Sequence, residues 1–218
     1  MTVSDSGKER IASCGLVPIV RFQRLDQAMK ITEALHGGGV NVVEFPMTSP
    51  QALQAIATIK AEWGEKMFVG AGTVLDSETA RACILAGAQF LVTPSVNAEI
   101  ARVCKRYSVA LCMGALTPTE VLAAWEAGSD FVKIFPCGAV GGTEYIRQLK
   151  APFPHIRMIP VGGVTLENAA DFIHAGCAAL GTGNCLIDPK AVAAGQFTGI
   201  AQTASRFLEI IKTARNVP

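Results

Sequence analysis

The sequence predicts one domain that folds as a (β/α)8 barrel of the TIM type, and three observations support this prediction. Short segments rich in β-branched residues recur about every 19 to 27 residues, and helix-length segments separate them. Several of the helical segments end in glycine, which supplies the left-handed cap that returns the chain to a strand. Eight strand–helix units fit within 218 residues, close to the minimum length of a closed barrel. Parallel βαβ units with right-handed crossovers are therefore expected along the whole chain.

The expected elements follow one another without a linker or a low-complexity segment that would mark a second domain. A helix within residues 5–11 belongs to an N-terminal helical extension over 1–14, which we expect at the bottom of the barrel domain over 15–218. The strands are expected to begin near Leu16, Val40, Met67, Phe90, Val109, Phe131, Ile156 and Ala178. The helices are expected over residues 25–35, 51–63, 78–86, 98–107, 118–127, 166–175 and 200–215.

Composition argues against several classes of partner. The formal net charge is +1, so no overall field attracts nucleic acid or an anionic membrane. The start of the chain is polar and no apolar run has the roughly 18 residues of a membrane span, so we expect a cytoplasmic enzyme. Seven cysteines without a C-x-x-C pair are expected to be reduced, and the three histidines are too scattered to predict a metal site.

A lysine in the sixth predicted strand is the first candidate for chemistry. Side chains alternate along a strand, so Phe131, Lys133 and Phe135 share the face that points into the barrel. Among apolar neighbours the charged form of Lys133 loses hydration, which favours a neutral, nucleophilic amine. A lysine that forms a Schiff base with a carbonyl substrate needs this property.

A glutamate in the second predicted strand is the second candidate. The same alternation places Val40, Val42 and Glu44 on the inner face, with Glu44 at the mouth of the barrel. Glu44 could carry protons beside Lys133. A structural Lys–Glu ion pair in the barrel interior is the alternative interpretation of the same pattern.

Glycine-rich segments end three of the predicted strands. Residues 161–164 and 181–184 follow strands seven and eight, where barrels often bind phosphate through backbone N–H groups. The third segment, residues 70–73, offers amides and the Thr73 hydroxyl to a carboxylate. Residues 161–164 or 181–184 alone would be interpreted as an ordinary turn. Because the two segments follow adjacent strands, a phosphate-binding site is the favoured interpretation.

Five motifs in order resemble one known family. They are VNVVE ending at Glu44, VGAGTVLD over 69–76, VTPS over 92–95, VKIFP over 132–136 and PVGGVTLEN over 160–168. From about residue 15 to 186 the chain is similar to the 2-keto-3-deoxy-6-phosphogluconate / 2-keto-4-hydroxyglutarate (KDPG/KHG) aldolases, which include 2-keto-3-deoxy-6-phosphogalactonate aldolases.

The resemblance implies a class I aldolase on a (β/α)8 barrel that cleaves 2-keto-3-deoxy-6-phosphogluconate to pyruvate and glyceraldehyde 3-phosphate. It implies that Lys133 forms the imine and Glu44 shuttles protons, with no cofactor or metal, in a cytoplasmic homotrimer. It also implies that Thr73 contacts the pyruvate carboxylate and that Pro94 and Phe135 pack around the reacting carbons. Gly72, next to Thr73, is expected to bind substrate as well. The phosphate site implied by the resemblance consists of Gly162, Gly163 and Asn184, and we add Gly183 from the glycine-rich segment after strand eight.

At three positions the residue differs from the one typical of the gluconate enzymes. Thr48 stands where they have an arginine that grips the carboxylate, Val161 where they often have threonine, and Asn184 where serine is usual. The first two departures point toward the galactonate branch, and Arg21 could supply the missing positive charge. The galactonate epimer and unphosphorylated 2-keto-4-hydroxyglutarate therefore stay open as substrates. So do two other classes: a phosphate-binding barrel isomerase or epimerase in which Lys133 acts only electrostatically, and a non-catalytic sugar-phosphate sensor.

Overall fold

The computed structural model describes residues 3–216, in which strands and helices alternate as predicted. The strands are β1 (Leu16–Pro18), β2 (Val42–Pro46), β3 (Phe68–Gly72), β4 (Phe90–Val92), β5 (Ala110–Ala115), β6 (Phe131–Ile134), β7 (Met158–Pro160) and β8 (Leu180–Thr182). The α-helices are α1 (Val3–Cys14), α2 (Leu25–Gly37), α3 (Ala52–Trp63), α4 (Ser77–Leu85), α5 (Ala98–Tyr107), α6 (Pro118–Glu126), α7 (Gly142–Lys150), α8 (Ala169–His174), α9 (Pro189–Ala193) and α10 (Thr198–Arg215). Short 3-10 helices occupy η1 (Gly64–Lys66) and η2 (Cys137–Val140).

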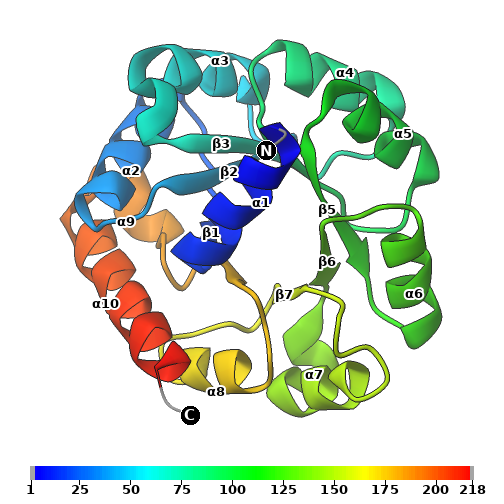
Figure 1. The fold of residues 1–218 in the computed structure, drawn as a ribbon. Coiled ribbons are helices and arrows are strands. Elements are labelled where there is room, and N and C mark those ends of the chain that lie inside the picture. Colours follow the sequence, from blue (N-terminus) through cyan, green and yellow to red (C-terminus); the bar gives the residue numbers. More distant parts are fainter. Residues whose placement is uncertain (1–2, 217–218) are drawn as a thin grey trace.

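All of the strand pairs are parallel, and they form two ladders. Strands β2 to β7 make a six-stranded sheet in chain order, and β1 pairs with β8 in a two-stranded sheet. Single bridges join the two sheets, one between Ile19 and Glu44 and the other between Val161 and Gly181. The strands curl around a common centre and the helices lie outside them (Figure 1). The predicted parallel α/β class is thus confirmed.

Local signals in the sequence explain where the helices begin and end. Asp76 and Asn97 accept hydrogen bonds from the first turns of α4 and α5, and Thr117 forms a capping box with Glu120 in α6. At the other ends, Gly39, Gly87, Gly128 and Gly176 have φ between 89° and 107°, which confirms the predicted left-handed caps.

Two apolar clusters lie on the two faces of the strands. Val132 and Ile134 pack outward in the larger cluster between strands and helices, whereas Phe131 packs in the smaller cluster inside the ring of strands. The alternation predicted for β6 is therefore confirmed, and Lys133 points inward with Phe131. The prediction for Val40 was wrong: β2 begins only at Val42, and Val40 packs in the outer cluster.

Helix α1 covers the interior at the amino-terminal ends of the strands. Figure 1 shows it running across the centre of the ring, and Ile11 packs in the inner cluster. The Arg10 guanidinium lies 5.1 Å from the Phe68 ring centroid and ties the helix to β3. The predicted helix is confirmed with longer bounds. The division into an extension over 1–14 and a domain over 15–218 stays a prediction, and residues 1, 2, 217 and 218 lie outside the described residues.

Two further expectations from the sequence concern the cysteines and membrane-spanning helices. Every cysteine is a free thiol, as predicted, and all but Cys14 and Cys185 are buried. None of the helices between residues 3 and 216 combines the length and apolar character that a membrane span requires.

Candidate active site

Glu44 and Lys133 lie inside the ring of strands, on β2 and β6. Their exposed fractions are only 3% and 6%. Both line a small enclosed cavity of about 10 Å³ together with Phe90, Cys112 and other residues of the inner cluster. The Lys133 Nζ and the Glu44 carboxylate oxygens lie more than 4 Å apart, so the two side chains form no direct ion pair. They therefore face each other across a gap instead of forming the tight structural pair considered as the alternative.

Burial dominates the protonation of Glu44. Loss of hydration raises the pKa of its carboxyl, and the positive charges of Lys133 and Arg21 oppose this rise. The net result is a carboxyl that holds its proton at a higher pH than an exposed glutamate does. A carboxyl with this property can act first as a proton acceptor and then as a proton donor.

Two neighbours define the space around the pair. The Lys133 Nζ lies 4.9 Å from the centroid of the Phe135 ring, which is 40% exposed at the mouth. On the other side, a methyl group at Gly72 would lie 1.8 Å from the Glu44 Oε1. The absence of a side chain at Gly72 is therefore what gives the Glu44 carboxylate its place.

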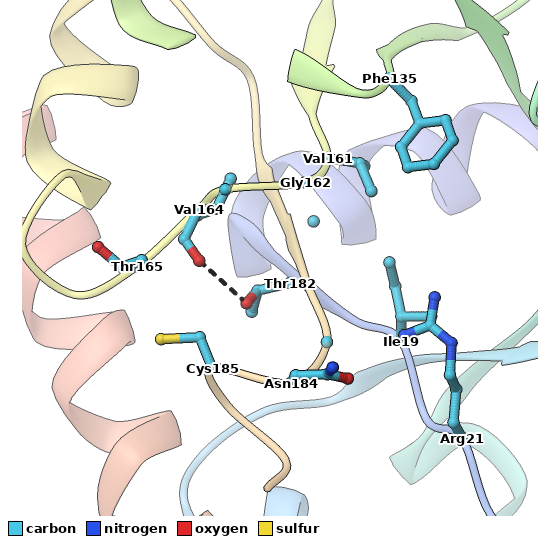
Figure 2. A pocket seen from close by; sticks show the side chains of 13 residues that line it. Ile19, Arg21, Phe135, Val161, Gly162, Val164, Thr165, Thr182, Asn184 and Cys185 are labelled. Carbon is cyan, nitrogen blue, oxygen red and sulfur yellow. Dashed lines mark hydrogen bonds between the residues drawn. The ribbon is translucent and has the colours of Figure 1, made fainter. Parts of the chain in front are cut away.

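A larger pocket opens beside this interior, at the carboxyl ends of β1, β7 and β8. Its volume is about 410 Å³, and Figure 2 shows its lining. Val161 and Gly181 line both this pocket and the inner cavity, so a ligand in the pocket would extend toward Lys133. The lining consists of Ile19, Arg21, Phe135, Val161, Gly162, Gly163, Val164, Thr165, Gly181, Thr182, Gly183, Asn184 and Cys185.

The glycine loop after β7 is held from outside by its neighbours. Gly162 and Gly163 have φ of 87° and 82°, a conformation that favours glycine. The Asn168 side chain donates to the Gly163 carbonyl and accepts from the Thr165 N–H, both at 2.8 Å. The Gly138 N–H donates to the Gly162 carbonyl at 2.8 Å. These bonds fix the loop without using any N–H group of the two glycines.

The backbone N–H groups of Gly163, Gly183 and Asn184 have no acceptor within residues 3–216. They belong to the loops after β7 and β8, and both loops line the same pocket. Free amides on converging loops can bind an anion such as a phosphate. The predicted phosphate residues are thus brought together in one place.

The remaining predicted residues lie on other sides of the mouth. Thr48 is exposed in the turn after β2, and Thr73 follows β3 with a φ of 55°. Pro94 follows β4 and crosses over β5, where a methyl group at Gly114 would lie 2.3 Å from the Pro94 carbonyl carbon. None of Thr48, Thr73 and Pro94 lines the large pocket.

The residue that sequence reasoning missed is Asn168. It stood within a quoted motif, yet its role in holding the Gly163 loop depends on a local turn that the pattern alone does not reveal. Helix α7, which begins at Gly142 directly after Gly141, was also not predicted. Within the described residues no group of three or more His, Cys, Asp or Glu side chains is arranged to hold a metal ion.

Comparisons with known proteins agree with this geometry. The family model described as KDPG and KHG aldolase matches residues 8–203. The chain is 39% identical to a 2-dehydro-3-deoxy-6-phosphogalactonate aldolase of Escherichia coli, covering 92% of this chain and 94% of that protein. It is 32% identical to a 2-dehydro-3-deoxy-phosphogluconate aldolase of Treponema pallidum, covering 93% and 96%. A solved structure titled "Native KDPGal structure" superposes with a TM-score of 0.85 at 38% identity, covering 93% and 96%. The chain therefore belongs to the KDPG and KHG aldolase family.

Proposed function

We propose that this protein is a class I aldolase that cleaves a 2-keto-3-deoxy-6-phospho sugar acid to pyruvate and glyceraldehyde 3-phosphate. The observation that carries the proposal is the burial of Lys133 and Glu44 at the inner end of a pocket whose outer end presents free backbone amides. A lysine nucleophile, a carboxyl proton carrier and a phosphate site are the parts that this reaction needs.

The reaction begins at the keto group of the substrate. The Lys133 amine, once it has given up its proton, attacks carbon 2, and loss of water leaves a protonated imine, which draws electrons from the neighbouring carbons. A carboxylate, Glu44, accepts the proton of the carbon 4 hydroxyl, and the bond between carbons 3 and 4 breaks. Glyceraldehyde 3-phosphate leaves, and the electron pair remains in an enamine on Lys133.

The second half of the reaction returns the enzyme to its starting state. Glu44 gives its proton to carbon 3 of the enamine, which restores the imine. Water then hydrolyses the imine and releases pyruvate. The raised pKa of Glu44 suits both steps, because it makes the carboxylate a stronger base than an exposed glutamate, and the carboxyl that results can return the proton.

The same proposal also places the phosphate and carboxylate ends of the substrate in the site. The phosphate occupies the loops of Gly162, Gly163, Gly183 and Asn184, which line one pocket. The carboxylate lies toward Gly72 and Thr73, where β3 ends next to Glu44. Phe135 and Pro94 then flank the reacting carbons.

The substrate epimer is set near carbon 4, and Val161 is the residue we expect to matter there. Val161 lines both the pocket and the inner cavity, and the 39% identical relative is a galactonate enzyme. We therefore expect faster cleavage of the 6-phosphogalactonate epimer than of the gluconate epimer, which is the second candidate because of the gluconate relative.

The isosteric change Val161→Thr is expected to shift the ratio of the two kcat/KM values toward gluconate by about tenfold or more, since it adds one hydrogen-bonding group. Measurement of pyruvate release from each epimer checks this prediction. An unchanged ratio of the two kcat/KM values would show that Val161 does not determine the preferred configuration at carbon 4.

Trapping of the imine tests the function itself. Incubation with pyruvate and borohydride is expected to add one reduced pyruvate group per chain, and peptide mass analysis is expected to find it on Lys133. An isomerase, an epimerase or a sensor that uses Lys133 only as a charge would give no adduct. Absence of the adduct in folded protein would therefore overturn the proposal.

The same proposal extends to the architecture and assembly. We infer that the bridges at Ile19 and Val161 close the strands into one eight-stranded barrel with a single domain. The resemblance to the family supports a cytoplasmic homotrimer.

A further inference from the structure

The turn that follows β4, residues 93–97, lies near the strand that carries Lys133. We propose that Thr93 is a positioning residue for the aldol chemistry. Its buried hydroxyl fixes the Pro94–Ser95 peptide beside Lys133, where the peptide forms one wall of the space around the imine and the enamine. This inference rests on the proposed function and adds a residue that has no part in the reaction scheme above.

The first observation is the space that Gly114 leaves on the inner face of β5. Cys112 of this strand packs inside the ring and Met113 packs outside it, so the alternation directs position 114 inward. A methyl group at Gly114 would lie 2.3 Å from the Pro94 carbonyl carbon, 2.4 Å from its oxygen and 2.7 Å from the Ser95 nitrogen. The Pro94–Ser95 peptide therefore occupies the inner position that a side chain at Gly114 would take.

The second observation is the register between β5 and β6. Gly114 is the partner of Lys133 in this parallel ladder. Neighbouring strands lie about 4.8 Å apart, and paired residues direct their side chains to the same face. Because Lys133 also points inward, its side chain and the Pro94–Ser95 peptide are neighbours on the inner face. An imine formed on Lys133 would have this peptide next to it.

The third observation is the set of hydrogen bonds that Thr93 makes. Thr93 is only 1% exposed, and its hydroxyl donates to the Ser95 carbonyl at 2.6 Å. The same hydroxyl accepts from the Gly114 N–H at 3.1 Å, and the Thr93 N–H donates to the Cys112 carbonyl at 3.1 Å. One side chain thus spans the turn across Pro94 and joins it to β5.

The hydroxyl is needed because of the proline that follows it. Pro94 has no N–H and cannot extend the ladder between β4 and β5, so the chain turns away after Thr93. The N–H of Gly114, which is buried, would then have no acceptor on β4, and the Thr93 hydroxyl takes this place. A buried N–H without an acceptor is costly, so loss of the hydroxyl is expected to shift the turn relative to β5.

Other hydrogen bonds hold the turn on its far side. The Asn97 side chain donates to the Leu75 carbonyl at 3.1 Å, and the Val74 N–H donates to the Val92 carbonyl at 3.2 Å. Both bonds join the end of β4 and its turn to the segment after β3. The Thr93 hydroxyl is thus the side-chain group that fixes the opposite side of the turn, the side next to β5.

A fixed peptide beside Lys133 matters for both proton transfers. The imine and the enamine hang on a flexible lysine side chain, and their reacting carbons must stay within reach of Glu44. A displacement of about 1 Å between reacting groups can lower a rate by roughly 10²-fold. A loosened Pro94–Ser95 peptide is therefore expected to slow proton transfer, while the Lys133 amine can still form the imine.

Thr93→Val tests the inference, because valine keeps the shape of threonine and replaces the hydroxyl by a methyl group. The measurement is the exchange of the pyruvate methyl protons with solvent deuterium, which needs Lys133 and Glu44 but no phosphorylated ligand. We expect Thr93→Val to lower the kcat of exchange by about tenfold to 10²-fold, with a smaller change in the KM for pyruvate. Trapping with borohydride should still label Lys133, and Thr93→Ser, which keeps the hydroxyl, should restore most of the exchange rate.

Thr32→Val is the matched control. Thr32 is fully buried in α2, outside the ring of strands, and its hydroxyl donates to the Ala28 carbonyl at 2.8 Å. This variant also loses a buried hydrogen bond, yet it should keep the kcat of exchange whatever happens to its thermal stability. A kcat in Thr93→Val as high as in Thr32→Val, or a Thr93→Ser variant as slow as Thr93→Val, would show that the hydroxyl has no positioning role.

Gly114→Ala tests the same peptide from the other side. The new methyl group would displace the Pro94–Ser95 peptide while the Thr93 hydroxyl stays, and Gly114 is not among the glycines with a positive φ. We expect a loss of kcat like that of Thr93→Val, again with trapping on Lys133 retained. Full exchange in Gly114→Ala would overturn the inference. Absence of both exchange and adduct in the folded wild-type protein would instead refute the proposed aldolase function.

Discussion

Replacing Lys133 by methionine is expected to lower the kcat of retro-aldol cleavage by about 10⁴-fold or more, the scale seen when a covalent nucleophile is removed. Methionine keeps the length and the apolar stem of the lysine but has no amine that could form the imine. Without the imine no electron sink exists for the bond between carbons 3 and 4. Pyruvate release from the phosphorylated substrate, followed with a lactate dehydrogenase couple, measures the loss.

Loss of the charged group is not expected to unfold Lys133→Met. The side chain is buried next to apolar residues of the inner cluster and makes no ion pair with Glu44 within 4 Å, so an apolar replacement leaves no broken bond behind. A matched control is Lys150→Met, because Lys150 donates to the carbonyls of Pro154 and Ile156 at 3.0 and 2.9 Å, away from the site. That variant should lose thermal stability and keep its kcat. Residual cleavage within tenfold of the wild type in Lys133→Met would exclude the imine mechanism.

The inward direction of Lys133 and Glu44 could be predicted because it depends only on local geometry. Side chains alternate along any strand, and the apolar pattern around Lys133 shows which face is inner. The same holds for the glycine loops at 161–164 and 181–184, since parallel strands bring their carboxyl ends to one edge. Neither prediction needed the register between neighbouring strands.

The relations between strands could not be predicted in the same way. The contact of Arg21 with Gly183 requires the register between β1 and β8, and the space that Gly72 leaves for Glu44 requires the register between β2 and β3. Three-residue strands such as β1 carry too little pattern to fix a register. The prediction for Val40 failed for a related reason, because the sequence does not show that β2 begins two residues later.

Asn168 illustrates a second limit. Its side chain holds the Gly163 loop through two hydrogen bonds within five residues, and the sequence TLEN does not distinguish this turn from a simple helix start. The sequence therefore located the glycines of the phosphate-type loop but not the residue that keeps them in place.

Gly72→Ala is expected to lower kcat by about 10²-fold to 10⁴-fold, the range for loss of a general acid–base group. The added methyl group would lie 1.8 Å from the Glu44 Oε1 and 2.4 Å from its Cδ, well inside van der Waals contact. The backbone of Gly72 does not have a positive φ, so alanine itself is tolerated there and the clash falls on the carboxylate. Glu44 must therefore rotate away from Lys133, and the proton transfer is lost although both catalytic residues remain.

Three measurements distinguish this displacement from a general defect. Imine trapping with pyruvate and borohydride should still label Lys133 in Gly72→Ala, whereas methyl proton exchange should fall as it does in Glu44→Gln. Adding Gly72→Ala to Glu44→Gln should then cost little more, because both changes remove the same function. Gly37→Ala, at a helical glycine with nothing within 4 Å of the new methyl group, provides the control and should keep full activity. Full exchange activity in Gly72→Ala would mean that Glu44 performs its chemistry from another position than the one it holds beside Gly72.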